Sequence, residues 1–348
     1  MNQMREVEVA LAGEEHFVTA VIDDSPSFER IRQFVTNLPP PHARYRVQRE
    51  QFVPTDFDEF LKAFCPWGKR HSVFQKKPTK WGVAPFSEGV WVNSVFENPL
   101  WRLSYFHWHR NFLTRLAFLV SQGFSGLHVI VEDSLPEYKI QSLEAMGIPQ
   151  SNLVPFSKVR GKYLESFVSV EGIDRHKQEA IFDFVRPNFL NIVAKNVKDY
   201  FGVSSPSQGN SIFVSRGHGD GRKLLNEDFV IEYLRKRGYE SVQVGNLSYE
   251  KQVRSLSAAG RVIGVHGGAL TNVMFSEYPE VLELAPIGHG LRPDFIPFAL
   301  SAGGHIATVG IRSENRANDL FVPERVLSWW IEQNGLKGNF FKLAEKVD

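Results

Sequence analysis

The feature that most constrains the fold lies between residues 211 and 333, where short apolar runs alternate with segments of helical periodicity. The predicted strands are 211–215, 241–244, 262–265, 281–284 and 305–309, and the predicted helices are 226–237, 248–259, one starting at 268, 295–302 and 323–333. Strands that are apolar throughout, each followed by a helix, are typical of a parallel sheet covered on both faces. The sequence therefore predicts a doubly wound α/β domain here.

The first half of the chain carries a similar but less complete pattern. Helical patterns at 105–122 and 137–146, apolar runs at 127–132 and 153–154, and a polar helix at 175–200 include one βαβ unit. Residues 202–210, rich in Gly, Ser and Pro, are typical of a linker. We therefore expect two doubly wound Rossmann-like domains, 1–203 and 204–348, that face each other across a ligand-binding cleft, with the last helix free to pack back on the first domain. Before residue 100, only 17–22 and 89–96 are strand candidates.

Composition excludes several classes of protein. Hydrophobic residues make 43% and charged residues 23% of the 348, which excludes a disordered chain and a coiled coil. A formal net charge of +1 gives no global attraction to nucleic acid, so we expect no nucleic-acid partner. One cysteine, Cys65, and an N-terminus without a signal-peptide pattern predict a cytoplasmic protein. The longest apolar stretch, 112–124, is too short and too interrupted to span a membrane.

One segment mixes aromatic and basic side chains: Trp67, Lys69, Arg70, Lys76, Lys77, Lys80 and Trp81. Such a mixture suits peripheral contact with the inner face of the membrane. A solvated loop whose tryptophans pack inward explains it more simply.

The sharpest local signal is the glycine turn at 261–272, which reads Arg-Val-Ile-Gly-Val-His-Gly-Gly-Ala-Leu-Thr-Asn. A strand runs into Gly267 and Gly268, and the predicted helix starts at once, so its free N–H groups and dipole face the strand's carboxyl edge and suit a phosphate. His266 is placed to donate to a phosphoryl oxygen, while Thr271 and Asn272 add polar groups to the first turn. The alternative is that His266 fills the turn and the glycines only allow close packing.

Two further features lie on neighbouring strands. Glu283 is a carboxylate within an apolar strand, where a ribose diol or a nearby cation would compensate its burial. The loop 215–223 carries Arg216 and Arg222, which are suited to clamp a diphosphate by forked hydrogen bonds. A solvated turn followed by an Asn226 helix cap accounts for the glycines of that loop but not for both arginines.

In the first domain, the helical pattern at 105–119 places His107, Arg110, Asn111 and Thr114 on one stripe. A polar stripe of this kind is typical of either an acceptor surface or a solvent-exposed face. The chain has no Gly-x-Ser-x-Gly elbow, Walker loop or zinc-binding spacing. Asp56 and Asp58 match the acid pair of metal-dependent sugar transferases, but helix capping explains them more simply.

Taken together, these segments resemble glycosyltransferase family 61. The resemblance rests on Tyr-Phe-His-Trp-His-Arg-Asn-Phe-Leu-Thr-Arg-Leu at 105–116, on Ser-Arg at 215–216 with Arg222 and Asn-Glu at 226–227, on His-Gly-Gly-Ala-Leu-Thr-Asn at 266–272 and on Val-Leu-Glu-Leu at 281–284. Their order and rough separation agree with the family pattern, over about residues 105 to 309.

The resemblance implies a two-domain GT-B fold and an inverting, metal-independent transfer of a sugar from a nucleoside diphosphate donor, a UDP-sugar, without a cofactor. It implies a glycan or a lipid-linked molecule as the acceptor, in capsular or other surface polysaccharide biosynthesis. The donor-binding residues are then Arg216, Arg222, His266, Gly267, Gly268, Leu270, Thr271, Asn272 and Glu283.

The sequence departs from the family at the expected catalytic acid, which falls on Asn111. An amide cannot act as a base, and inversion needs one. His107, on the same stripe, is the first candidate, with Asp294 and His289 behind it. Two other functions stay open: a nucleotide-sugar-binding protein without catalysis and an NAD-dependent oxidoreductase, the latter disfavoured because the glycine turn lies late in the chain.

Overall fold

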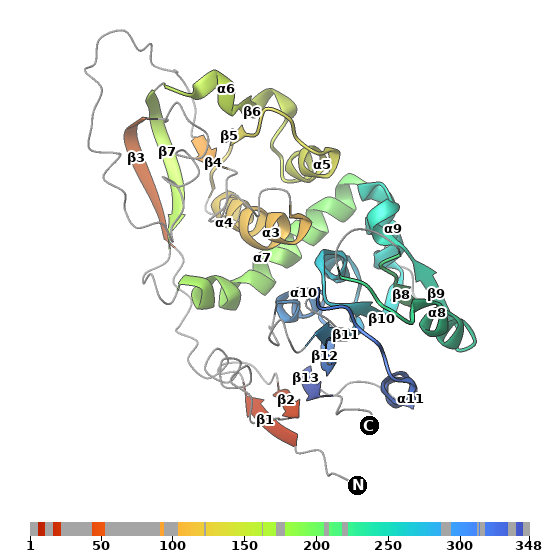
Figure 1. Ribbon diagram of the computed structural model, residues 1–348. Helices are drawn as coiled ribbons and strands as arrows, with labels where there is room; N and C mark the ends of the chain where they lie inside the picture. Colours follow the sequence, from red (N-terminus) through yellow and green to blue (C-terminus); the bar gives the residue numbers. More distant parts are fainter. Residues whose placement is uncertain are drawn as a thin grey trace. The chain divides into compact units, whose positions relative to one another are not determined.

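The computed structural model describes residues 6–10, 17–21, 44–52, 91–93, 104–121, 123–161, 163–171, 178–204, 209–217, 222–286, 294–311, 313, 317–332 and 339–343 (Figure 1). The chain forms two compact units. We call Pro39–Tyr200 the middle unit, and Phe201–Asp348 together with Met1–Leu38 the C-terminal unit. The sequence prediction placed a boundary between 203 and 204; the C-terminal unit begins at Phe201 and also takes in the first strands of the chain.

The C-terminal unit is built on one sheet in the strand order β1-β2-β13-β12-β11-β10-β8-β9. The strands are β1 (Glu6–Ala10), β2 (Phe17–Val21), β8 (Asn210–Val214), β9 (Tyr239–Val242), β10 (Ala259–Val265), β11 (Glu280–Pro286), β12 (His305–Ile311) and β13 (Asn339–Leu343). All neighbours pair in parallel except β1 and β2. The parallel sheet predicted for this half of the chain is confirmed.

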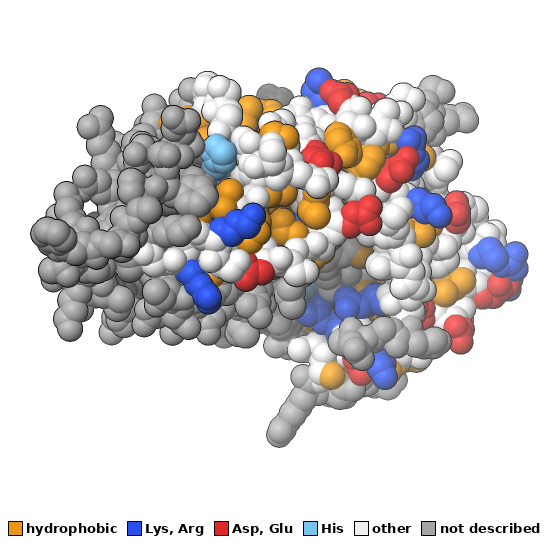
Figure 2. All heavy atoms as spheres, turned by 90° about the horizontal axis from the view of Figure 1, so that it is seen from above, with side chains coloured by type: hydrophobic (Ala, Val, Ile, Leu, Met, Phe, Trp, Pro, Cys, Tyr) orange, Lys and Arg blue, Asp and Glu red, His pale blue; other side chains and the backbone are white. Residues whose placement is uncertain are grey.

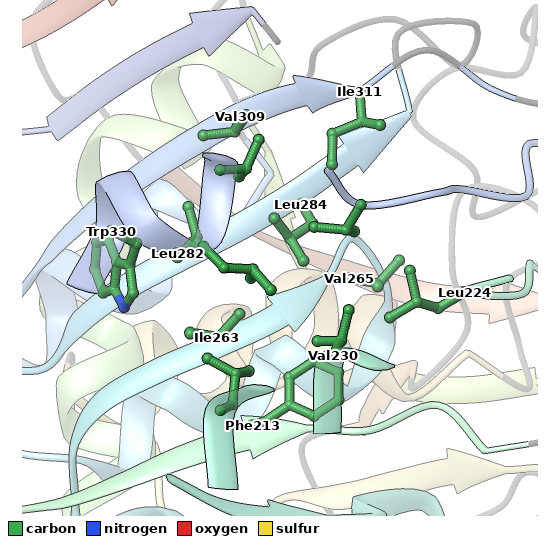
Figure 3. Packing of buried hydrophobic residues seen from close by; sticks show 14 of the residues in the cluster. Phe213, Leu224, Val230, Ile263, Val265, Leu282, Leu284, Val309, Ile311 and Trp330 are labelled. Atoms are coloured by element: carbon green, nitrogen blue, oxygen red, sulfur yellow. The ribbon is translucent and has the colours of Figure 1, made fainter. Parts of the chain in front are cut away.

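Helices follow the strands of this sheet in sequence: α8 (Glu227–Arg235), α9 (Tyr249–Ser257), α10 (Ile296–Ser301) and α11 (Glu324–Glu332), with 3₁₀ segments η5 (Val244–Asn246) and η6 (Gly268–Phe275). One sheet face packs against α8 and α11 in a single apolar cluster, which includes Phe213, Val230, Ile263, Leu282 and Trp330 (Figure 3). The last helix, α11, thus buries Trp330 against the sheet of its own unit.

The opposite sheet face carries a row of residues in register across four strands: Val214, Gly264, Glu283 and Thr308. A Cβ on Gly264 would lie 2.7 Å from Leu270 Cδ2, so η6 packs directly over this row. Glycine at this position allows the close approach of η6 to the sheet. The row therefore places polar groups of β11 and β12 beneath the segment that follows β10.

The middle unit contains a smaller mixed sheet in the order β3-β7-β4-β5-β6, parallel except for the edge strand β3. Its strands are β3 (Arg44–Phe52), β4 (Trp91–Asn93), β5 (His128–Val131), β6 (Leu153–Pro155) and β7 (Tyr163–Glu171), and its helices are α3 (Tyr105–His107), η3 (Trp108–Leu113), α4 (Thr114–Ser121), α5 (Glu137–Ala145), η4 (Gln150–Asn152), α6 (Phe156–Val159) and α7 (Gln178–Tyr200). The predicted βαβ unit is present as β5, α5 and β6. Both units are α/β with parallel sheets, as in Rossmann-like folds.

Two local predictions need correction. The segment starting at Gly268 is a 3₁₀ helix and not an α-helix, and the Leu270 N–H already donates to Gly267 O at 3.0 Å. The helical pattern at 105–122 is interrupted by the π-helical segment η3. Single inserted π turns are frequent at functional sites, because they rotate the side chains that follow.

The described surface carries Lys and Arg side chains interspersed with Asp and Glu side chains on the face seen in Figure 2. This distribution agrees with a net charge close to zero. No helix within the described part of the chain combines the length and the apolar character that a membrane span requires.

Candidate functional site

The order of strands in the C-terminal unit defines where a ligand site is expected. Taken in chain order, β8 to β12 are arranged as β9-β8-β10-β11-β12, so the winding direction reverses between β8 and β10. At such a point the loops after the two neighbouring strands diverge to opposite faces and leave a crevice at the carboxyl edge. Arg216 follows β8 and His266 follows β10. The topology therefore brings two predicted donor-binding segments to this one edge.

Gly267 and Arg216 make the closest contact at this edge. A Cβ on Gly267 would lie 2.5 Å from Arg216 Nη1, which is less than the sum of the van der Waals radii of the two atoms. The backbone at Gly267 is extended, with φ 166°, a conformation that any residue can adopt. Glycine is needed here because a side chain would clash with Arg216. The missing side chain lets the guanidinium lie on the turn.

Both predicted arginines converge on the backbone carbonyl of His266. Arg216 Nη1 donates to this oxygen at 3.2 Å and Arg222 Nη1 donates to it at 2.5 Å. Burial lowers the pKa of the Arg216 guanidinium, an effect that Glu227 and Asp319 partly oppose. Among the described residues, no carboxylate lies within ion-pair distance of the Arg216 side chain. A half-buried cation without a paired carboxylate favours the approach of an anion.

The arginine loop is anchored at both ends. Glu227, in the first turn of α8, accepts hydrogen bonds from Ser215 Oγ at 2.9 Å and from the Arg216 N–H at 2.8 Å. At the other end, the Lys223 N–H donates to Asp319 Oδ1 at 2.7 Å. These contacts fix the backbone on either side of the loop, so both guanidinium groups start from defined positions.

The His266 ring faces a different set of groups. Its Nδ1 lies 2.5 Å from Glu283 Oε1, and the other carboxylate oxygen of Glu283 accepts from Thr308 Oγ1 at 2.7 Å. Glu283 is 1% exposed, so its carboxylate has both oxygens bonded within the protein. The edge of the Phe295 ring packs on the imidazole with centroids 5.2 Å apart, and Asp294 Oδ2 lies 4.0 Å from Nε2.

The remaining predicted residues of the glycine turn lie inside the fold. Leu270, Thr271 and Asn272 are fully buried. Asn272 Nδ2 donates to Ala269 O at 3.0 Å, and Thr271 Oγ1 has no hydrogen-bond partner among the described residues. In this structure these three side chains are therefore buried in the fold, with Leu270 against Gly264 of β10, and the side chains at the crevice are those of Arg216, Arg222 and His266.

The predicted stripe of the first domain lies in the middle unit and spans the π segment. Asn111 Nδ2 lies 3.1 Å from His107 Nδ1, so the two residues are neighbours as their spacing predicted. Asn111 is buried, and Thr114 Oγ1 donates to Arg110 O at 2.7 Å. His109, which the sequence analysis did not single out, is fully buried, and burial lowers its pKa to about 4. This helix therefore holds one half-buried and one fully buried histidine.

Some predicted residues lie outside the described part of the chain: His289, Asp56, Asp58, Cys65 and the aromatic and basic segment of Trp67 to Trp81. Within the described part, no group of three or more His, Cys, Asp or Glu side chains is arranged to hold a metal ion.

Sequence reasoning missed two residues that contact predicted donor-binding residues: Thr308 contacts Glu283, and Phe295 contacts His266. Thr308 is a polar residue in the apolar strand predicted at 305–309, and it lies in register with Glu283 on the neighbouring strand. Phe295 immediately follows Asp294 and is the N-cap residue of α10. A threonine within a largely apolar strand indicates a buried polar contact. That its partner is Glu283 follows only from the strand order.

Comparison with known proteins assigns the chain to a family. No curated protein matches the chain. The family model described as Glycosyltransferase 61 matches residues 105–282, which is half of the chain. The match begins at the middle-unit stripe, includes both arginines and the glycine turn, and ends at Leu282, within the first half of β11. The chain therefore belongs to glycosyltransferase family 61.

Proposed function

We propose that this protein is an inverting glycosyltransferase that moves a sugar from a nucleoside diphosphate donor, a UDP-sugar, to a glycan or lipid-linked acceptor. The observation that carries the proposal is the Arg216 guanidinium, which lies on Gly267 at the reversal of strand order and has no carboxylate partner among the described residues. Family membership supports glycosyl transfer as the chemistry.

The charge of the leaving group explains why two guanidinium groups belong at this edge. When the bond from the sugar to the diphosphate breaks, negative charge develops on the terminal phosphate. Arg216 and Arg222 already share one acceptor, the His266 carbonyl, and each guanidinium carries further N–H donors in a fixed fork. Donors held in place before the reaction stabilise developing charge without reorganisation.

The same arrangement supports a reaction without a metal ion. In the proposal, Arg216 and Arg222 supply the positive charge that a divalent cation supplies in metal-dependent transferases. The enzyme is proposed to work in the cytoplasm at the inner face of the membrane, in surface or capsular polysaccharide synthesis, and to recruit no cofactor. The proposed location, the proposed pathway and the lack of a cofactor rest on the sequence analysis and on the resemblance to the family.

Titration calorimetry with UDP as the probe tests the donor site. Arg216→Ala is expected to weaken UDP binding by about 10- to 100-fold, since a hydrogen bond to a charged group contributes about 1.5–3 kcal/mol. Arg235→Ala is the matched control, because Arg235 is an exposed arginine of α8 paired with Glu232. EDTA is expected to leave the affinity unchanged. Equal UDP affinity in Arg216→Ala and the wild-type protein would remove the basis of the proposal.

A binding protein without catalysis is the second candidate, and one observation favours it: an amide, Asn111, stands where the family carries an acid. Release of UDP from UDP-glucose, UDP-galactose, UDP-N-acetylglucosamine and UDP-xylose, with oligosaccharide acceptors, separates the two. Saturable UDP binding without any glycosidic product would favour the binding protein.

A further inference from the structure

Residue 266 faces opposite charges on its two sides. Its backbone carbonyl accepts from the guanidinium groups of Arg216 and Arg222. Its ring has one carboxylate at each nitrogen, Glu283 at Nδ1 and Asp294 4.0 Å from Nε2. A phosphate is attracted to the first side and repelled from the second. The diphosphate therefore belongs beside the two guanidinium groups, and the Nε2 side suits a neutral hydroxyl group.

The contact with Glu283 decides which ring nitrogen holds the proton. An ionised carboxylate only accepts hydrogen bonds, so the imidazole Nδ1 must carry the hydrogen of the 2.5 Å contact. In the neutral ring, Nε2 is then left with a lone pair. A histidine held this way by a carboxylate is the arrangement that serves as a general base in hydrolases of unrelated folds.

The carboxylate is itself held in place. Thr308 Oγ1 donates to its second oxygen at 2.7 Å, and Glu283 and Thr308 are register neighbours on the adjacent strands β11 and β12. The edge of Phe295 packs against the imidazole ring. The ring orientation is therefore set by its contacts with Glu283, which Thr308 holds in turn, and with Phe295; a proton acceptor at a fixed position requires such contacts.

The family reaction needs such a group, and the expected acid is missing. Inversion requires that a base take the proton of the acceptor hydroxyl. Asn111 cannot do so, and its amide nitrogen lies 3.1 Å from His107 Nδ1. Within the described residues of the C-terminal unit, His266 combines an oriented lone pair with a position beside the proposed diphosphate site.

We propose that His266 is the catalytic base and that Glu283 and Thr308 are its positioning residues; this inference rests on the proposed function. The Nε2 lone pair takes the proton of the acceptor hydroxyl while the hydroxyl oxygen forms its bond to the anomeric carbon. The bond from that carbon to the diphosphate oxygen breaks, and its electron pair leaves with the diphosphate. Glu283 and Asp294 stabilise the resulting imidazolium, which returns its proton to water.

Three substitutions test the roles separately. His266→Asn keeps an N–H near the position of Nδ1 for Glu283 but removes Nε2, and it is expected to lower transfer by about 100-fold or more with UDP affinity changed by less than about threefold. Glu283→Gln keeps the shape without the charge and is expected to lower kcat by about tenfold or more, with KM for the donor unchanged. Thr308→Val removes the bond to Glu283 and is expected to lower kcat by severalfold.

Tyr233→Phe is the matched control. It also removes one side-chain hydrogen bond from the C-terminal unit, Tyr233 to Ser328 at 2.8 Å, but on the opposite side of the sheet. This variant is expected to keep transfer within about twofold of wild type, since the bond contributes to stability alone. A loss of transfer in Tyr233→Phe equal to that in Thr308→Val would reduce the role of Thr308 to stability and overturn its assignment.

A spectroscopic measurement shows, without any substrate, which nitrogen of the His266 ring carries the proton. Nitrogen-15 spectra of the full chain, labelled in histidine and assigned with His266→Asn, are expected to show the proton of the neutral ring on Nδ1, with a signal that shifts in Glu283→Gln. A proton on Nε2 instead would overturn the inference, because that nitrogen would then have no lone pair to offer.

The two proposals fail in different ways. If the wild-type protein does not bind UDP, the proposed function fails and the base role falls with it. If the wild-type protein binds UDP and His266→Asn transfers sugar at the wild-type rate, only the base role fails.

Discussion

Two histidines of this protein each have a polar side chain at Nδ1, but the two side chains differ in chemistry. His266 has its Nδ1 against Glu283, a buried carboxylate that a third residue fixes from the next strand. His107 has its Nδ1 against Asn111, an amide on the same turn of one helix. A carboxylate compensates the charge of a protonated ring and an amide does not. The comparison teaches that the residue behind a histidine, and not the histidine itself, indicates where a proton can be accepted.

The largest expected effect compares the two histidines directly. His107→Asn is expected to lower transfer by less than about tenfold, against the loss of about 100-fold or more expected for His266→Asn, because only His266 is assigned the proton transfer. Release of UDP from the active UDP-sugar, measured for both variants in parallel, gives the ratio. A larger loss in His107→Asn than in His266→Asn would reverse the assignment of the base.

A smaller effect concerns the arginine that lies on the glycine turn. Gly267→Ala places a Cβ against the Arg216 guanidinium, which must shift, and UDP affinity is expected to fall by about tenfold. Gly245→Ala is the matched control, because no atom lies within 4 Å of a Cβ added at Gly245. Calorimetry with UDP on both variants measures the difference. Unchanged affinity in Gly267→Ala would show that the close approach of Arg216 does not matter for binding.

The third prediction concerns stability against acid, and it tests whether the middle-unit helix also holds a purely structural histidine. Burial lowers the pKa of His109 to about 4, below the ordinary histidine value of 6.5. The unfolded chain therefore binds a proton that the folded chain does not, and stability is lost as the pH falls below about 6.5. The loss amounts to about 2 kcal/mol at pH 5 for this one residue.

Urea unfolding at pH 7 and pH 5, followed in the wild-type protein and in His109→Gln, isolates that contribution. The wild-type protein is expected to lose more stability than the variant between the two values. The same loss in both proteins would mean that His109 is protonated in the folded chain.

The smallest effect is expected from restoring the family acid. Asn111→Asp places a carboxylate beside His107 Nδ1, in the position that the family pattern assigns to an acid. If His266 supplies the base, transfer is expected to stay within about threefold of wild type. A rise of tenfold or more in transfer rate would show that the middle-unit helix takes part in proton transfer. The role of proton acceptor would then no longer belong to His266 alone.

Much of the fold could be predicted because the strands of the C-terminal sheet are buried on both faces and read as apolar runs. The run predicted at 262–265 lies within β10, and the run at 281–284 lies within β11. β13 and β1 were missed. β13 pairs with β12 and with β2, which is distant in the sequence, and β1 pairs with β2. Local periodicity carries no information on such pairings.

The site could be predicted as a set of residues but not as an arrangement. The glycine turn and the two arginines have the types and spacing that suit an anion, so they were recognised without coordinates. The partner of Glu283 could not be recognised, because it depends on β12 lying next to β11 in a register that pairs Glu283 with Thr308. The 3₁₀ form of η6 was also missed, because a segment that begins at Gly268 and is buried along most of its length reads as an α-helix.

The register row of Gly264, Glu283 and Thr308 has a practical consequence. The groups that orient the imidazole belong to hydrogen-bonded strands in the centre of the sheet, whereas connecting loops carry most of the variation that proteins tolerate. Under the proposed mechanism, exchange of surface loops is therefore expected to leave the pair of His266 and Glu283 intact.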